Sequence, residues 1–208
     1  MNPLKKLASQ TAVYGLSSII GRAINFLFVP WYTHVFATDQ FGVYTEMYAN
    51  VAFLIVLLTY GMETAFFRFS NNENYETHKV YSTGLTSLLV TSSIFISCCT
   101  FYAQEIANWL LYPDHSEYVV WFALIIGLDA ISSLPLAKLR KDEKPMKFAM
   151  VNLTNIGVYI VLNLFFLVYL PYAYDNGGNF LTDWFFDGKV SVGMIFISNL
   201  IASIIKLA

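Results

Sequence analysis

Residues 118–137 read YVVWFALIIGLDAISSLPLA, and this stretch decides the fold class. It is twenty residues long, and Asp129 is its one charged side chain. An α-helix rises 1.5 Å per residue, so about 20 apolar residues cover the roughly 30 Å hydrocarbon core of a bilayer. The stretch is therefore predicted to cross a membrane as a helix.

Similar stretches lie on both sides of it. The predicted spans are residues 10–34, 42–67, 80–103, 118–137, 147–171 and 188–207. Of the 208 residues, 57% are hydrophobic and 12% are charged, whereas soluble domains carry roughly 25% charged residues. The sequence thus predicts an all-α, polytopic membrane protein with about six transmembrane helices. The segment 104–111 is amphipathic and is expected to lie along the membrane interface.

Basic residues predict the orientation. Lys and Arg gather before the first span, around residues 68–79, in residues 138–147 and at Lys206, whereas the first and third loops contain none. Since cytoplasmic loops are rich in Lys and Arg, we expect a cytoplasmic N-terminus. The net charge of -2 gives no indication of nucleic-acid binding.

Polar residues form rows along four of the spans. The rows are Thr11, Gly15, Ser18, Arg22 and Asn25; Glu46, Asn50, Tyr60, Thr64 and Arg68; Ser82, Thr86, Ser93, Ser97 and Thr100; and Asn152, Asn155, Tyr159 and Asn163. For the hydroxyl row of the third span we expect helix packing, because small polar residues are the usual composition of membrane helix interfaces. For the asparagine row of the fifth span, packing and ligand binding remain equal alternatives.

Charged residues inside the spans are the candidates for function. Arg22 lies deep in the first span, where a charge costs at least about 2.5–3.5 kcal/mol, so a functional role is favoured over an ion pair with Asp129 or Glu63. Those two carboxylates are candidates for coupling or for structure. Arg68 lies near a span end, where its side chain can reach the interface.

No motif of enzyme chemistry is present. The sequence contains no H-E-x-x-H, no G-x-S-x-G and no Gly-rich phosphate loop. We therefore expect no enzyme, no metal site and no cofactor.

Several ordered segments carry a family resemblance. They are Leu4–Ala8, Gly21-Arg22, Thr38–Tyr44, Gly61–Arg68, Pro135–Arg140 and Lys144–Ala149. Together they resemble the polysaccharide transport family, the O-antigen and capsule flippases of the multidrug/oligosaccharidyl-lipid/polysaccharide exporter superfamily. The resemblance implies a two-lobed transporter that works by alternating access. Residues 1–208 correspond to its N-terminal six-helix lobe, and the C-terminal lobe is expected elsewhere, in a longer chain or a second one.

The resemblance also implies a substrate. Such proteins move oligosaccharides linked to polyprenyl pyrophosphate across the bacterial cytoplasmic (inner) membrane, for surface polysaccharides such as lipopolysaccharide. Arg22 and Arg68 would contact the pyrophosphate, and Asn25 and Asn155 the head group. The expected partners are this substrate, membrane lipids and other polysaccharide assembly proteins. The alternatives are a multidrug/cation antiporter that uses Glu63 or Asp129, a non-transport subunit of an assembly complex, and a membrane-embedded glycolipid enzyme.

Overall fold

The computed structural model describes residues 3–178, 180–186 and 188–207, without the side chains of residues 3–7, 9, 10, 22 and 25. The described residues form ten α-helices and one π-helix, with no strand among them. The elements are α1 (Pro3–Val35), α2 (Thr38–Thr59), α3 (Met62–Ser70), α4 (Thr77–Phe101), α5 (Ala103–Trp109), α6 (Ser116–Lys141), α7 (Pro145–Leu164), η1 (Phe165–Tyr169), α8 (Leu170–Asp175), α9 (Phe180–Phe185) and α10 (Gly193–Leu207).

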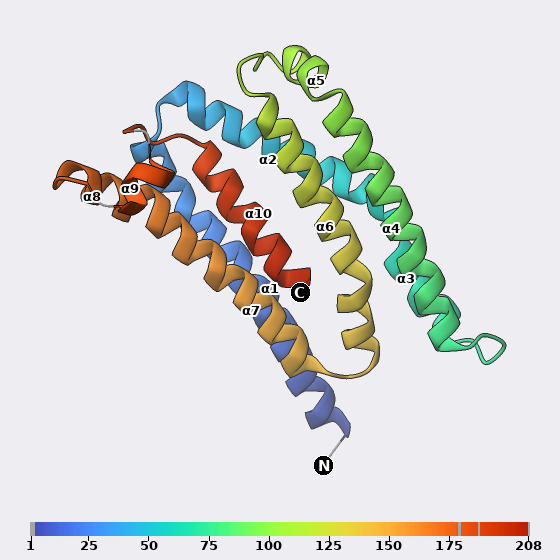
Figure 1. Ribbon diagram of the computed structural model, residues 1–208. Helices are drawn as coiled ribbons and strands as arrows, with labels where there is room; N and C mark the ends of the chain where they lie inside the picture. Colours follow the sequence, from blue (N-terminus) through green and yellow to red (C-terminus); the bar gives the residue numbers. More distant parts are fainter. Residues whose placement is uncertain (1–2, 179, 187, 208) are drawn as a thin grey trace.

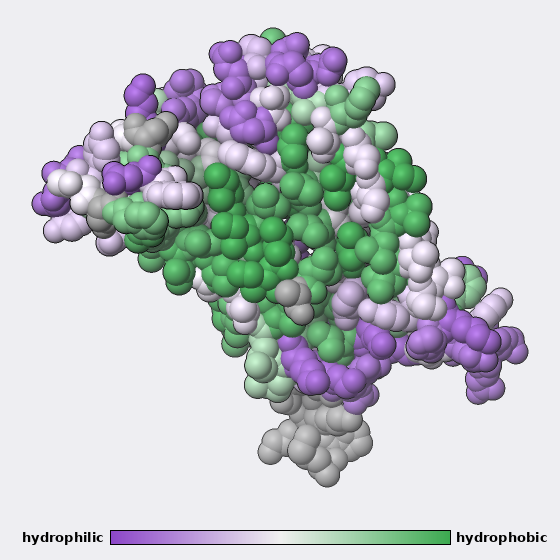
Figure 2. All heavy atoms as spheres, in the orientation of Figure 1, coloured by the Kyte–Doolittle hydropathy of each residue, from purple (hydrophilic) through white to green (hydrophobic). Residues whose placement is uncertain are grey.

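Among the described residues, five helical segments are long and apolar enough to cross a membrane. They are Thr11–Val35, Thr38–Ser70, Thr77–Phe101, Ser116–Lys141 and Pro145–Asp175. The prediction of an all-α, polytopic membrane protein is confirmed. Figure 2 shows a broad hydrophobic band between hydrophilic ends on the face that it draws.

The connections between helices alternate between two ends of the bundle (Figure 1). The start of α1 and the α3–α4 and α6–α7 connections lie at one end, which we call the basic end because Lys138, Arg140, Lys141 and Lys144 surround the α6–α7 connection. The α1–α2 connection, α5 and α9 lie at the other, which we call the opposite end. This placement follows the alternation of basic and non-basic loops in the sequence.

The predicted second span, 42–67, is broken in the structure. α2 ends at Thr59, and α3 begins at Met62. Tyr60 and Gly61 between them take left-handed backbone angles, with φ of 33° and 72°. Glycine adopts this conformation without steric cost, so Gly61 is the residue that permits the break.

The predicted sixth span, 188–207, is helical only from Gly193. Fifteen residues reach about 22 Å at 1.5 Å per residue, which is less than a full hydrocarbon core. Lys206 near the end of this helix forms an ion pair with Asp129 near the middle of α6, with 3.0 Å between Nζ and Oδ1.

α4 packs on α6 through small residues. A Cβ added at Gly127 of α6 would lie 2.6 Å from Ile96 Cδ1, and one added at Gly84 of α4 would lie 3.0 Å from Leu134 Cδ2. Gly84, Leu88 and Ser92 are the buried residues of α4. Small residues thus let the two helices approach closely.

The hydroxyl row of the third span does not take part in this packing. All five of its members are exposed: Ser82, Thr86, Ser93, Ser97 and Thr100. At about 100° per residue they lie on the side of α4 away from Gly84, Leu88 and Ser92. The packing interpretation of this row is therefore wrong within the described chain, because the helix buries its other face.

The amphipathic segment 104–111 falls on α5, a short helix between the third and fourth spans. Its Ala103 and Ala107 are buried against α6, whereas Trp109 and the following Leu111 are 81% and 82% exposed. The expected amphipathic helix is present.

Candidate functional site

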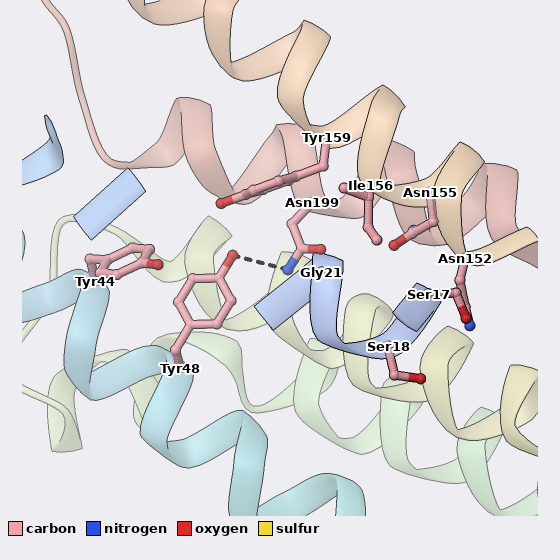
Figure 3. A pocket seen from close by; sticks show the side chains of 10 residues that line it. All are labelled: Ser17, Ser18, Gly21, Tyr44, Tyr48, Asn152, Asn155, Ile156, Tyr159 and Asn199. Carbon is pink, nitrogen blue, oxygen red and sulfur yellow. Dashed lines mark hydrogen bonds between the residues drawn. The ribbon is translucent and has the colours of Figure 1, made fainter. Parts of the chain in front are cut away.

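A polar cavity of about 390 Å³ lies among α1, α2, α7 and α10 (Figure 3). Its lining residues are Ser17, Ser18 and Gly21 of α1, Tyr44 and Tyr48 of α2, Asn152, Asn155, Ile156 and Tyr159 of α7, and Asn199 of α10. Eight of these ten residues carry a hydroxyl or an amide on the side chain. Inside a membrane protein such groups are costly to leave unpaired, so a cluster of them around an open space indicates a place for a polar ligand or water.

The α1 side of the cavity offers hydrogen-bond acceptors. The hydroxyls of Ser17 and Ser18 each donate to the Tyr14 carbonyl oxygen, at 3.0 Å. A serine oxygen that has used its proton in this way still has lone pairs for a ligand donor. The backbone carbonyl thus sets the hydrogen-bonding character of both serines.

The α7 side offers both donors and acceptors. Asn152, Asn155 and Tyr159 are spaced three and four residues apart, so one face of the helix presents all three. Figure 3 shows the two asparagines projecting from α7 toward α1. Each amide can donate two hydrogen bonds and accept others, which suits a ligand rich in hydroxyl or amide groups.

The remaining wall comes from α2 and α10. Asn199 Nδ2 donates to the Tyr48 hydroxyl oxygen at 2.9 Å, drawn as the dashed line in Figure 3. Tyr44 lies beside Tyr48, with 4.7 Å between ring centroids. Aromatic rings next to amides provide apolar faces and polar edges together, a combination that can hold a sugar ring.

A buried cluster of hydrogen bonds adjoins the cavity at Tyr159. The Tyr32 hydroxyl donates to Asn163 Oδ1 at 2.7 Å and lies 3.0 Å from the Tyr159 hydroxyl. Because the Tyr32 proton is used on Asn163, Tyr159 is the donor to Tyr32. Asn163 Nδ2 donates in turn to the Tyr159 carbonyl oxygen at 2.8 Å. We call Tyr32, Tyr159 and Asn163 the tyrosine–asparagine cluster.

The predicted head-group residues have different places. Asn155 lines the cavity, and its contact with a head group stays a prediction. Arg22 directly follows the cavity residue Gly21 in the sequence, but the side chains of Arg22 and Asn25 lie outside the described residues. Arg68 is exposed at the end of α3 and is not a lining residue, and its guanidinium carbon lies 5.9 Å from the Phe69 ring centroid.

The two candidate coupling carboxylates both have cationic partners. Glu63 Oε1 lies 2.7 Å from Arg140 Nη2, between α3 and the end of α6. Asp129 Oδ1 accepts from Lys206 Nζ at 3.0 Å, and the Ser203 hydroxyl lies 3.4 Å away. Neither carboxylate lines the cavity.

Sequence reasoning missed part of the cavity wall. Tyr44, Tyr48 and Asn199 were not predicted as site residues, although each lines the cavity. Two signals were available: the four-residue spacing of Tyr44 and Tyr48, and the position of Asn199 as the one amide in the stretch 188–207. Both signals depend on knowing that α2 and α10 face α7, which is a tertiary fact.

The sequence of residues 7–208 matches the model of the family described as polysaccharide biosynthesis protein. The chain belongs to this family. No curated protein and no solved structure matches it. The chain is thus a multi-pass membrane protein of this family with a polar, amide-lined cavity among its helices.

Proposed function

We propose that this chain belongs to a flippase for oligosaccharides linked to polyprenyl pyrophosphate, acting in the bacterial inner membrane with its N-terminus in the cytoplasm. The observation that supports the proposal most directly is the polar cavity among α1, α2, α7 and α10, in a family concerned with polysaccharides. A sugar head group needs a polar environment on its way across the hydrocarbon core, and hydroxyl and amide side chains supply one.

The head group would use two kinds of side chain. Asn152, Asn155 and Asn199 would bond sugar hydroxyls, and the tyrosines would pack against sugar rings. Arg22 would bind the pyrophosphate, because a guanidinium presents a rigid fork of donors that matches phosphate oxygens. The polyprenyl chain would stay in the surrounding lipid, and a second lobe would complete the alternating-access cycle.

The test is polysaccharide export in cells that lack the wild-type protein. Arg22→Ala removes a charge-assisted contact, so we expect surface polysaccharide to fall about tenfold or more while lipid-linked oligosaccharide accumulates. Asn155→Leu removes a neutral hydrogen-bonding group, so we expect a fall of about two- to tenfold. Amounts in the membrane are compared by immunoblot.

Thr154→Leu is the matched control, because Thr154 is exposed and is not a lining residue. It should export as the wild type does. Wild-type export by Arg22→Ala would remove the proposed role of that arginine. Normal polysaccharide in the complete absence of the protein, together with a changed susceptibility to cationic drugs, would replace the flippase with a drug antiporter.

A further inference from the structure

The tyrosine–asparagine cluster adjoins the polar cavity at Tyr159. Along α7, Asn152, Asn155 and Tyr159 line the cavity, and Asn163 follows Tyr159 by one turn. Along α1, Tyr32 lies eleven residues after the lining residue Gly21, which corresponds to about 16 Å. Both helices run from the basic end toward the opposite end, so the cluster lies between the cavity and the opposite end (Figure 1).

The side chains of the cluster are buried and tightly packed in this structure. Tyr32 and Asn163 are each 0% exposed, and Tyr159 is 8% exposed. Phe28 stacks on Tyr32 with 5.5 Å between ring centroids, and Tyr44 meets the same ring edge-on at 5.3 Å. All three side chains of the cluster are thus buried, and its hydrogen bonds join α1 directly to α7.

The helix that carries Asn163 loses its regular hydrogen bonding immediately beyond it. Phe165–Tyr169 form the π-helix η1, in which the Leu170 amide donates to the Phe165 carbonyl five residues earlier. Pro171 follows and has no N–H to continue the ladder. π-helical turns and proline are the usual places where a membrane helix bends.

The facing helix has a similar irregularity. Pro30 lies inside α1 two residues before Tyr32 and removes one backbone donor. The Pro30 carbonyl oxygen also accepts from the Thr33 hydroxyl at 2.7 Å and lies 2.7 Å from His34 Nδ1. The irregularity of α1 thus lies just before Tyr32, whereas that of α7 lies just after Asn163, and the cluster joins the two helices between these points.

We propose that Tyr32, Tyr159 and Asn163 form a gate that closes the cavity toward the opposite end, and that the gate opens when α1 bends at Pro30 and carries Tyr32 away from α7. Separation of α1 from α7 would break both hydrogen bonds of the Tyr32 hydroxyl, to Asn163 and to Tyr159, at once. This gate does not depend on which solute occupies the cavity. The gate can therefore be tested independently of the proposed substrate.

Cysteine accessibility tests the gate. The complete protein is studied in native membrane vesicles with Cys98 and Cys99 replaced by alanine and with Asn155→Cys as a reporter in the cavity. A membrane-impermeant maleimide is added to right-side-out and to inverted vesicles, so that each face of the membrane is probed separately. With the gate intact, labelling of the reporter thiol from the opposite end should be slow.

Tyr32→Phe keeps the ring and removes the hydroxyl that joins Asn163 and Tyr159. It disfavours the closed state, since two polar groups lose their partner. We expect labelling of the reporter thiol from the opposite end to rise about five- to tenfold, with labelling from the basic end unchanged. Tyr159→Phe, which removes one of these bonds, should give a smaller rise and also serves if Tyr32→Phe accumulates poorly.

Tyr118→Phe is the matched control, because Tyr118 is a buried tyrosine of α6 that does not line the cavity. It should leave labelling from both faces unchanged. Unchanged labelling from the opposite end in both Tyr32→Phe and Tyr159→Phe would overturn the gate. An equal rise from both faces would overturn it too, because that result indicates general loosening of the bundle. Export of polysaccharide is not needed for either outcome.

Discussion

The α4–α6 interface and the α1–α7 interface are built from similar small and polar residues, yet only the second borders a polar cavity along part of its length. At the first, a Cβ on Gly127 would come within 2.6 Å of Ile96. At the second, a Cβ added at Gly21 would lie 3.0 Å from Ile156 Cδ1, so the two helices are close there too, yet Asn155 beside Ile156 lines the open cavity. The difference shows that glycine and serine allow close approach but do not enforce it, and that the neighbouring side chains decide.

Gly127→Leu should cause the largest loss of stability among the changes that test this contrast. The new side chain has no room against Ile96 and Ser92, and overpacking of this kind typically costs about 1–3 kcal/mol. We expect a clear fall in the midpoint of thermal unfolding, followed by tryptophan fluorescence in detergent. Gly157→Leu is the control, since it extends into open space, and equal falls for the two variants would contradict the contrast.

The ion pair between Asp129 and Lys206 links α6 to α10, and α10 also carries Asn199 of the cavity. Each single variant, Asp129→Asn or Lys206→Met, leaves one intramembrane charge without its partner. The side chains are 30% and 17% exposed, so we expect about 1–2 kcal/mol for each loss, below the value for a fully buried pair.

A double-mutant cycle on thermal unfolding measures the coupling of this pair. The double variant should recover part of the combined loss, because no unpaired charge remains. Strictly additive losses would show that the pair contributes nothing to the attachment of α10. The exchanged pair Asp129→Lys with Lys206→Asp tests whether the attraction or the particular geometry matters.

The contact between Tyr112 and Glu46 should have the smallest effect. The Tyr112 hydroxyl donates to Glu46 Oε2, joining the α5–α6 connection to α2. Partial burial, followed by the hydrogen bond to Glu46 and the charge of Glu46, raises the pKa of Tyr112 to about 12. An unfolded tyrosine ionises near pH 10, so this stabilisation is complete below about pH 10 and is lost as the pH rises through about 12.

The wild type should therefore lose slightly more stability than Tyr112→Phe as the pH rises from about 9 to about 11.5, by less than about 1 kcal/mol because the contact is exposed. Unfolding midpoints of the two proteins across this range provide the measurement. Parallel pH profiles of the two proteins would show that the contact between Tyr112 and Glu46 contributes nothing to stability.

Much of the fold could be predicted because hydropathy acts locally. Residues 118–137 were predicted to form a membrane-spanning helix from their apolar composition, and the structure gives α6 as Ser116–Lys141. The break at Tyr60 and Gly61 could not be predicted, since glycine is common in membrane helices and many remain continuous. The end of regular α-helix at Leu164 also depends on local backbone bonds that the apolar sequence around it does not reveal.

The site divides in the same way. The spacing of Asn152, Asn155 and Tyr159 placed them on one helix face, and the structure turns that face toward the cavity. The sequence could not predict which residues lie across the cavity from that face, because Tyr48 and Asn199 come from helices that are distant in the sequence. The partners of Glu63 and Asp129, Arg140 and Lys206, were likewise decided by how the helices pack.

By itself the sequence determined that this protein lies in a membrane, which segments form helices and which helix faces are polar. Each of these properties depends on residues within a few turns of one another. The tertiary structure alone decided which polar face surrounds a cavity, which one points away from the bundle and which charges pair. Those outcomes depend on distances between helices, such as the one that places the Tyr32 hydroxyl 2.7 Å from Asn163, and no local pattern contains them.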